Sequence, residues 1–156
     1  MKKVIIMSGI PGCGKSTWAN NYILSNPKEK VFIVASDEIR KELGGKVQYF
    51  EEEDKVWNIF LTRTNNYAKV YDDVTVIMDA TNLTNHFRRY YFENTPDFDK
   101  HILVNFNLPL EKIHQQNKSR SSDRIVNDEA MQRLINEYEL IDEGTKKLFD
   151  EYIEIN

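Results

Sequence analysis

Gly9-Ile10-Pro11-Gly12-Cys13-Gly14-Lys15-Ser16-Thr17 gives the clearest indication of how this chain folds. It fits the pattern G-x-x-x-x-G-K-[ST] of a phosphate-binding loop. An apolar run of strand length, residues 4–7, precedes the stretch, and residues 16–24 can form a helix after it. Because the motif requires a strand before it and a helix after it, the sequence predicts a nucleotide-binding loop at this position.

The chemistry of this loop predicts ATP and Mg²⁺ as cofactors. Glycines let the backbone bend until successive N–H groups point at one phosphate, and the helix start adds further donors and a partial positive charge. Lys15 can reach the β- and γ-phosphates, and the Ser16 hydroxyl can ligate Mg²⁺. We therefore expect the whole loop to contact the nucleotide, namely Gly9, Ile10, Pro11, Gly12, Cys13, Gly14, Lys15, Ser16 and Thr17.

Length and composition indicate one domain, covering residues 1–156, with an ordinary globular make-up. The formal net charge of −4 gives no general attraction for nucleic acid, although a local basic groove is compatible with it. The single cysteine, Cys13, excludes an internal disulfide and fits a reducing cytoplasm. No segment approaches the length of a membrane span, so we expect a cytoplasmic protein without membrane attachment, and the oligomeric state stays open.

Strand and helix patterns alternate along the whole chain. This order predicts an α/β fold of the P-loop NTPase type, kinase-like, with a parallel sheet flanked by helices and ligands at the carboxyl ends of the strands. Strands are expected at residues 3–8, 31–34 (a buried type), 74–78 (central), 102–106 and near 152–155 (an edge). Helices are expected up to about residue 25, from a cap at Ser36 or Asp37 to residue 44, at 51–71 and 85–94, from Pro109, and at 128–141.

A first polar cluster, Ser36–Arg40, follows the second strand. The carboxylate of Asp37 can face the loop and accept a proton from an attacking hydroxyl. Arg40 lies one helical turn further on the same face and could hold a phosphate or carboxylate of the acceptor through two hydrogen bonds. The alternative is a helix-capping aspartate with a surface arginine.

A second cluster, Asp79–Asn85, follows the third strand. An aspartate that ends an apolar strand beside the loop strand occupies a Walker-B type position, from which Asp79 can hold Mg²⁺ directly or through water. Thr81 and Asn82 can contact the substrate or simply shape the turn.

A third cluster, Lys118–Arg124, belongs to a polar segment between two helices, and we expect a lid at about residues 118–127. A mobile segment that carries arginine can close over a phosphoryl transition state and exclude water. One of Arg120 and Arg124 could reach the γ-phosphate and the other the adenine or α-phosphate. The alternative is a solvated loop.

Bases and aromatics mix at Arg88–Phe92, a combination that can stack nucleobases. On a helix, however, the face that these aromatics share with Phe87 is expected to belong to the core.

Other classes of P-loop protein fit less well. A small GTPase needs Asp-x-x-Gly after its third strand and Asn-Lys-x-Asp for guanine, whereas residues 79–82 lack the glycine and residues 117–120 end in arginine, which cannot accept hydrogen bonds. A motor ATPase usually has an acidic pair where the sequence has Asp79-Ala80. A non-catalytic module that binds ATP without acceptor-dependent turnover stays as an alternative.

With these residues in view, the chain resembles the kinase domain of phage polynucleotide 5′-hydroxyl kinase and related small P-loop kinases. The resemblance covers nearly the whole chain and rests on residues 1–6, Gly12–Ala19, Asp37-x-x-Arg40, Asp79-x-Thr81-Asn82-Leu83-x-x-x-x-Arg88-Arg89 and the arginine-bearing lid before Val126.

This resemblance implies an ATP-dependent kinase whose partner is the 5′ end of DNA or RNA. It implies that Asp37 is the general base, that Arg40 binds a phosphate of the acceptor, and that Lys15 and a lid arginine, with Arg120 as first choice, stabilise the transferred phosphoryl group. Thr81, Asn82 and Arg88 join the acceptor site. A 3′-phosphatase activity is not expected. Relatives with the same loop and base phosphorylate nucleosides, modified bases or small metabolites, which is the alternative for the acceptor.

Overall fold

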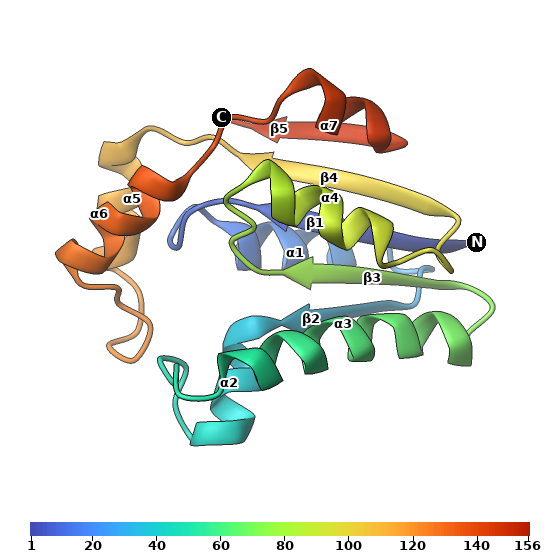
Figure 1. The fold of residues 1–156 in the computed structure, drawn as a ribbon, viewed down its shortest axis with the longest axis horizontal. Helices are drawn as coiled ribbons and strands as arrows, with labels where there is room; N and C mark the ends of the chain where they lie inside the picture. Colours follow the sequence, from blue (N-terminus) through green and yellow to red (C-terminus); the bar gives the residue numbers. More distant parts are fainter.

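Five strands alternate with seven helices in the computed structural model, which describes residues 1–156 (Figure 1). The strands are β1 Lys2–Ser8, β2 Val31–Ala35, β3 Val74–Asp79, β4 Lys100–Phe106 and β5 Glu151–Ile155. The helices are α1 Lys15–Ser25, α2 Ser36–Gly44, α3 Glu53–Val70, α4 Asn85–Glu93, α5 Leu110–Lys118, α6 Asp128–Glu137 and α7 Glu143–Leu148. No helix has both the length and the apolar character that a membrane span requires.

All five strands are parallel and lie in the order β2-β3-β1-β4-β5. This arrangement confirms the predicted α/β fold with a parallel sheet. Since every strand runs in the same direction, the segments that follow β1, β2, β3 and β4 all emerge at one edge of the sheet. The phosphate-binding loop and the first two polar clusters of the sequence therefore share that edge. The third cluster follows α5 and reaches the same edge through the contacts of Arg124 with α2.

Side chains of the central strands alternate between two cores, because successive residues of a strand point to opposite faces. Val4 and Ile6 of β1 belong to the core beneath α3, α4 and α7, where Phe60 of α3 is fully buried. Ile5 and Met7 belong to the core beneath α1, α5 and α6. A strand covered on both faces carries an uninterrupted apolar run, which is why residues 4–7 could be identified as a strand from the sequence.

Three details differ from the sequence-based expectations. β2 is an edge strand rather than a buried one, and Ile33 is 37% exposed. Residues 128–141 do not form one helix: α6 ends at Glu137, and α7 was not predicted. Neither Ser36 nor Asp37 caps α2, because the cap position falls on Ala35 and both residues lie in the first turn.

Arg88 of α4 is fully buried beneath the carboxyl edge of the sheet. Its guanidinium donates to Ser8 Oγ (3.0 Å) at the end of β1 and to the carbonyl oxygens of Asn82 (3.0 Å) and Leu83 (3.1 Å) in the loop after β3. It also donates to Asn85 Oδ1 and to the carbonyl oxygen of Glu139 (both 2.8 Å). The expectation that Arg88 binds the acceptor is therefore wrong for this structure, because its donors hold the fold together.

We predict that Arg88→Ala strongly destabilises the protein. Breaking a buried charged network typically costs about 3–5 kcal/mol, because the partner oxygens lose their donors inside the protein. The free energy of unfolding, measured by urea denaturation, should fall by that order. Arg89→Ala is the matched control: Arg89 is the neighbouring arginine, half exposed and paired with Asp142, and should cost at most about 1 kcal/mol. Equal losses in the two variants would contradict this role for Arg88.

Candidate active site

A cavity of about 1460 Å³ opens at the carboxyl edge of the sheet. Its walls come from the phosphate-binding loop, from α2 and the start of α3, from the segment after β3, and from α5, α6 and the connection between them. Six lysine and arginine side chains and five acidic side chains line it, in a protein with a net charge of −4. The cationic side chains suit an anionic ligand such as a nucleoside triphosphate.

The loop between β1 and α1 has the backbone that its glycines allow. Gly12 and Gly14 adopt φ values of 86° and 93°, in the left-handed region that favours glycine. Gly14 is also the N-cap residue of α1, so the unsatisfied N–H groups at the start of that helix point toward the loop. A Cβ atom at Gly12 would lie 3.3 Å from Ile113 O and Asn117 N, so the loop packs directly against α5.

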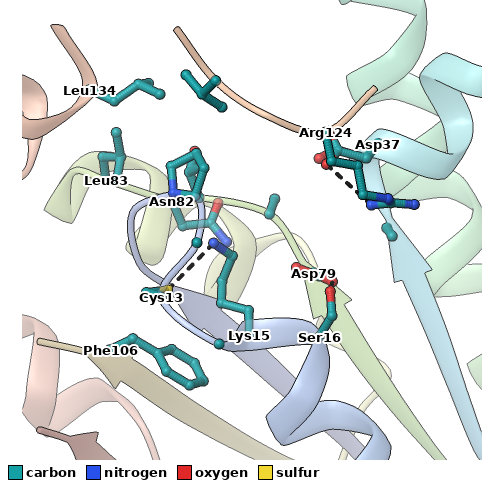
Figure 2. A pocket seen from close by; sticks show the side chains of 18 of the residues that line it. Cys13, Lys15, Ser16, Asp37, Asp79, Asn82, Leu83, Phe106, Arg124 and Leu134 are labelled. Carbon is teal, nitrogen blue, oxygen red and sulfur yellow. Dashed lines mark hydrogen bonds and ion pairs between the residues drawn. The ribbon is translucent and has the colours of Figure 1, made fainter. Parts of the chain in front are cut away.

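Lys15 folds back over the loop (Figure 2). Its Nζ donates to Gly9 O (2.9 Å) and Ile10 O (3.3 Å) and lies 3.7 Å from Cys13 Sγ. Cys13 itself is buried, and a Cβ atom at Gly9 would lie only 2.7 Å from its sulfur. The ammonium therefore sits inside the loop, within the volume where phosphate oxygens would be held.

Ser16 and Asp79 meet below the loop, where Ser16 Oγ donates to Asp79 Oδ2 at 3.2 Å (Figure 2). Burial raises the pKa of the Asp79 carboxyl, and the nearby Lys15 ammonium opposes that shift. A desolvated carboxylate next to a hydroxyl suits Mg²⁺, which takes few protein ligands and completes its shell with water and phosphate oxygens.

Thr81 and Asn82 both line the cavity. Asn82 has a φ of 44° and donates through Nδ2 to Met7 O at 2.7 Å, so its side chain braces the turn after β3. The carbonyl oxygen of Thr81 accepts from Gly9 N at 2.8 Å and joins this turn to the start of the phosphate-binding loop. Shaping the turn is thus the role of Asn82 that the contacts support.

Asp37 and Arg40 face each other across one turn of α2. Ala35 pairs with Asp79 in the β2–β3 register, which brings Asp37 to the same edge as Asp79. Arg40 donates from Nη1 to Asp37 Oδ1 at 3.0 Å, and from Nε and Nη2 to the two carboxylate oxygens of Glu53 at 3.0 and 2.8 Å. The guanidinium is nearly buried and also lies over the ring of Trp57. Asp37 lines the cavity, and Arg40 bonds its Oδ1 but not its Oδ2.

Sequence reasoning missed Glu53, the first residue of α3. It lies 13 residues beyond Arg40, and no local spacing connects the two. The bidentate contact follows from the way α3 packs against α2, a tertiary contact that sequence periodicity does not report.

The lid forms the connection between α5 and α6 and reaches across the cavity to α2 (Figure 2). Arg124 donates to Glu38 Oε1 at 2.6 Å, and its Nη1 lies 3.9 Å from Asp37 Oδ2. Gln48 donates to the carbonyl oxygen of Ile125 at 2.8 Å and ties the lid to the segment before α3. These contacts place an arginine beside the carboxylate that was predicted to be the base.

Arg120 lies deeper in the same cavity. Its Nη1 is buried without a hydrogen-bond partner. Burial lowers the pKa of the Arg120 guanidinium, and the Asp37 carboxylate opposes this shift. A buried cationic donor without an acceptor is costly unless a ligand supplies one, so Arg120 is placed to receive an anion.

The aromatic face of α4 differs from the expectation that it belongs to the core. Phe87 and Tyr90 are 48% and 42% exposed and line the cavity, whereas Tyr91 is buried and packs on Phe60. Phe50, before α3, lines the cavity as well and is 60% exposed. The wall of the cavity therefore presents exposed aromatic rings.

Around one cavity the structure gathers these predicted site residues: residues 11–17 of the loop, Asp37, Arg40, Asp79, Thr81, Asn82, Arg120 and Arg124. Gly9 and Ile10 do not line it, although their carbonyl oxygens accept from Lys15. Arg88 also lies outside it and serves the fold.

Solved structures with the same fold include several kinases. Kti12 from Chaetomium thermophilum, in complex with ADP-AlF3, matches with a TM-score of 0.72 at 14% identity over 97% of this chain and 88% of that one. A chain of the Pnkp1/Rnl/Hen1 RNA repair complex matches with a TM-score of 0.76 at 22% identity, and the matched region covers 96% of this chain but only 46% of that chain. Shikimate kinase from Acinetobacter baumannii, in complex with shikimate, matches with a TM-score of 0.61 at 19% identity over 100% of this chain and 84% of that one.

At these identities the similarity establishes the fold and leaves the substrate open. A family model described as an AAA domain matches residues 4–141, most of the sequence. The chain therefore belongs to this AAA domain family, AAA_33, and has a P-loop NTPase fold of the kind found in kinases.

Proposed function

We propose that this protein is an ATP-dependent kinase that transfers a phosphoryl group to the 5′-hydroxyl of DNA or RNA. The observation that carries the proposal is the position of Asp37. Its Oδ1 is held by Arg40, its Oδ2 lies 3.9 Å from Arg124, and the residue lines a cavity that also holds the phosphate-binding loop and Arg120. A carboxylate so fixed, across from a phosphate site, suits a general base.

In the proposed reaction, the acceptor oxygen forms a bond to the γ-phosphorus while the bond from that phosphorus to the β-phosphate oxygen breaks, so that ADP leaves. The acceptor proton passes to Asp37 Oδ2. Lys15 and the lid arginines bind the oxygens of the transferring group, where negative charge is spread over the equatorial positions. Mg²⁺, held by Ser16 and Asp79 when bound, would neutralise charge on the β- and γ-phosphates.

Arg120 and Arg124 are assigned complementary parts in this step. Arg120 has a buried Nη1 that lacks an acceptor, which a phosphate oxygen would supply. Arg124 Nη1 lies 3.9 Å from Asp37 Oδ2, beside the proposed base. Closure of the lid by Gln48 would hold both arginines over the nucleotide and exclude water.

Support for a nucleic acid acceptor comes from the aromatic rings and from relatives. Phe50, Phe87 and Tyr90 offer exposed rings on which nucleobases could stack. Two structures of similar fold come from RNA-directed proteins, namely the RNA repair complex and a fungal RNA kinase, the latter at a TM-score of 0.67 and 18% identity over 99% of this chain and 74% of that one.

A small-molecule acceptor is the second candidate, and one observation favours it. Arg40, the expected ligand of an acceptor phosphate, already bonds Glu53 through two hydrogen bonds and Asp37 through a third. An arginine paired in this way could serve only to hold Asp37. Kinases of shikimate and of a sugar are among the proteins of similar fold.

The deciding experiment is a transfer assay with γ-labelled ATP and Mg²⁺ across 5′-hydroxyl oligonucleotides, nucleosides, sugars and shikimate. The proposal expects the oligonucleotides to be the best acceptors. A small metabolite that outperforms every oligonucleotide would establish the second candidate. ATP binding without transfer to any acceptor would instead indicate a nucleotide-binding module.

We predict that Lys15→Ala abolishes phosphoryl transfer and leaves the fold intact. The hydrogen bonds of the Lys15 ammonium go to the loop itself, so the substitution removes a phosphate ligand without emptying a core position. Transfer should be measured alongside the circular dichroism spectrum and the melting temperature. A folded variant with unchanged turnover would remove the loop from the mechanism.

Asp37→Asn should lower kcat by about 10²- to 10⁴-fold, the usual contribution of a general base, with ATP affinity largely kept. The amide is nearly isosteric but cannot take the proton. Glu38→Gln, one residue further along α2, is the matched control, since the Glu38 side chain accepts from the lid residue Arg124 and not from Arg40. A loss of only a few-fold in Asp37→Asn would place the base elsewhere.

Arg40→Ala tests whether the guanidinium binds the acceptor or only positions Asp37. If Arg40 binds an acceptor phosphate, kcat/KM for a nucleoside 3′-phosphate or a short oligonucleotide should fall by an amount equivalent to about 2–4 kcal/mol of transition-state stabilisation. The loss with a bare nucleoside should be much smaller. If it only positions the base, kcat should fall equally for all acceptors. Steady-state kinetics with paired acceptors separates the two, and equal losses would argue against the phosphate contact.

A further inference from the structure

Three side chains in the whole protein have a buried polar atom without a hydrogen-bond partner: Asn65, Gln116 and Arg120. Asn65 lies on α3, away from the cavity, but Gln116 and Arg120 both line it. Backbone bonds from Ser119 N to Gln116 O and from Arg120 N to Asn117 O continue the turn of α5 into the lid. The two unpartnered groups therefore lie about one helical turn apart, on one face.

These two groups make complementary demands on a ligand. The unpaired atom of Gln116 is Oε1, an acceptor, and that of Arg120 is Nη1, a cationic donor. A single ligand must bring an N–H or O–H donor to the first and an oxygen or nitrogen acceptor to the second. A nucleoside triphosphate has both, with donors on its base and acceptors on its phosphates.

The direction in which the nucleotide must lie places its base beside Gln116. The transferable phosphate has to face Asp37 on α2, so the nucleoside extends to the opposite side of the loop. That side is formed by α5 and α6, and α5 packs against Gly12 there. Figure 2 shows Leu134 and Phe106 on this side of the loop, away from Asp37. Leu108, Val126 and Ala130 line the cavity with them and provide apolar walls for a planar ring.

We propose that Gln116 reads the base of the phosphoryl donor and selects adenine. This inference rests on the proposed use of a nucleoside triphosphate and goes further, because it names the base and the residue that recognises it. An amide of glutamine pairs with adenine through two hydrogen bonds, with Oε1 accepting from the N6 amino group and Nε2 donating to N7. Adenine would thereby satisfy the buried Oε1 that the protein leaves without a partner.

Guanine cannot make the same pair. At the corresponding edge it presents O6 and N7, both of which are acceptors. Whichever way the amide of Gln116 is turned, its oxygen faces another acceptor, so one buried polar atom stays unpaired. The site should therefore bind ATP more tightly than GTP although every phosphate contact is identical.

The test is direct binding of Mg²⁺-bound ATP, GTP and 7-deaza-ATP by titration calorimetry, with no acceptor present. The wild type should bind ATP at least about tenfold more tightly than GTP, and 7-deaza-ATP, which lacks the N7 acceptor, should bind more weakly than ATP. In Gln116→Ala, the Kd for ATP should rise by about tenfold while that for GTP stays unchanged, and the penalty for 7-deaza-ATP should disappear.

Gln115→Ala is the matched control, since Gln115 is the neighbouring glutamine on α5, is exposed and does not line the cavity. Its three Kd values should equal those of the wild type, and GTP binding reports whether Gln116→Ala is folded. Equal affinity of the wild type for ATP and GTP, or equal losses for both nucleotides in Gln116→Ala, would overturn the inference. Selective binding of adenine without phosphoryl transfer would support base recognition by Gln116 and contradict the proposed kinase activity. Phosphoryl transfer without base selectivity would support the kinase activity and contradict base recognition by Gln116.

Discussion

The guanidinium of Arg88 lies fully buried beneath the carboxyl edge of the sheet, where a cation is tolerated only if its N–H groups point at oxygens. Those oxygens come from the end of β1, from the turn after β3, from α4 and from Glu139. The turn after β3 lines the cavity, and the end of β1 is hydrogen-bonded to that turn. One side chain thus fixes the spacing between the strand that enters the phosphate-binding loop and the turn that follows Asp79, and the geometry of the site depends on that spacing.

The two ends of the cavity differ in how completely their polar groups are satisfied. At the α2 end, Arg40 donates to both Asp37 and Glu53, and the three side chains keep their places without a ligand. At the α5 end, Gln116 and Arg120 each leave a buried atom unpaired. A preformed network suits a base that must hold its orientation during a reaction, because little rearrangement is needed when the acceptor arrives. Unpaired groups suit a ligand that supplies their partners on binding.

Sequence reasoning was most successful where a pattern depends on near neighbours. The apolar run before Gly9, the glycines of the loop and the alternation of strands and helices predicted the fold, because each reports local backbone conformation or burial on both faces of a strand. The same topology brought Asp37, Asp79 and the lid to one edge. Contacts between distant segments could not be predicted in this way. Glu53 meets Arg40 only because α3 packs on α2. From the sequence, Arg88 looks like a surface arginine, and only the structure shows the five oxygens that accept its hydrogen bonds.

Gly9 and Cys13 share one small volume inside the phosphate-binding loop. A methyl group at position 9 would lie 2.7 Å from the sulfur of Cys13 and 3.0 Å from Cβ of Phe106, and Phe106 is buried in the core beneath the loop. Replacing Cys13 by a smaller residue would remove the sulfur and with it the shorter of these two contacts. The two positions should therefore vary as a pair across homologous sequences, with alanine or serine tolerated at position 9 only where position 13 carries glycine or another side chain that ends before the sulfur. The motif leaves position 13 free, yet the size of the side chain there limits which residues can replace the motif glycine at position 9.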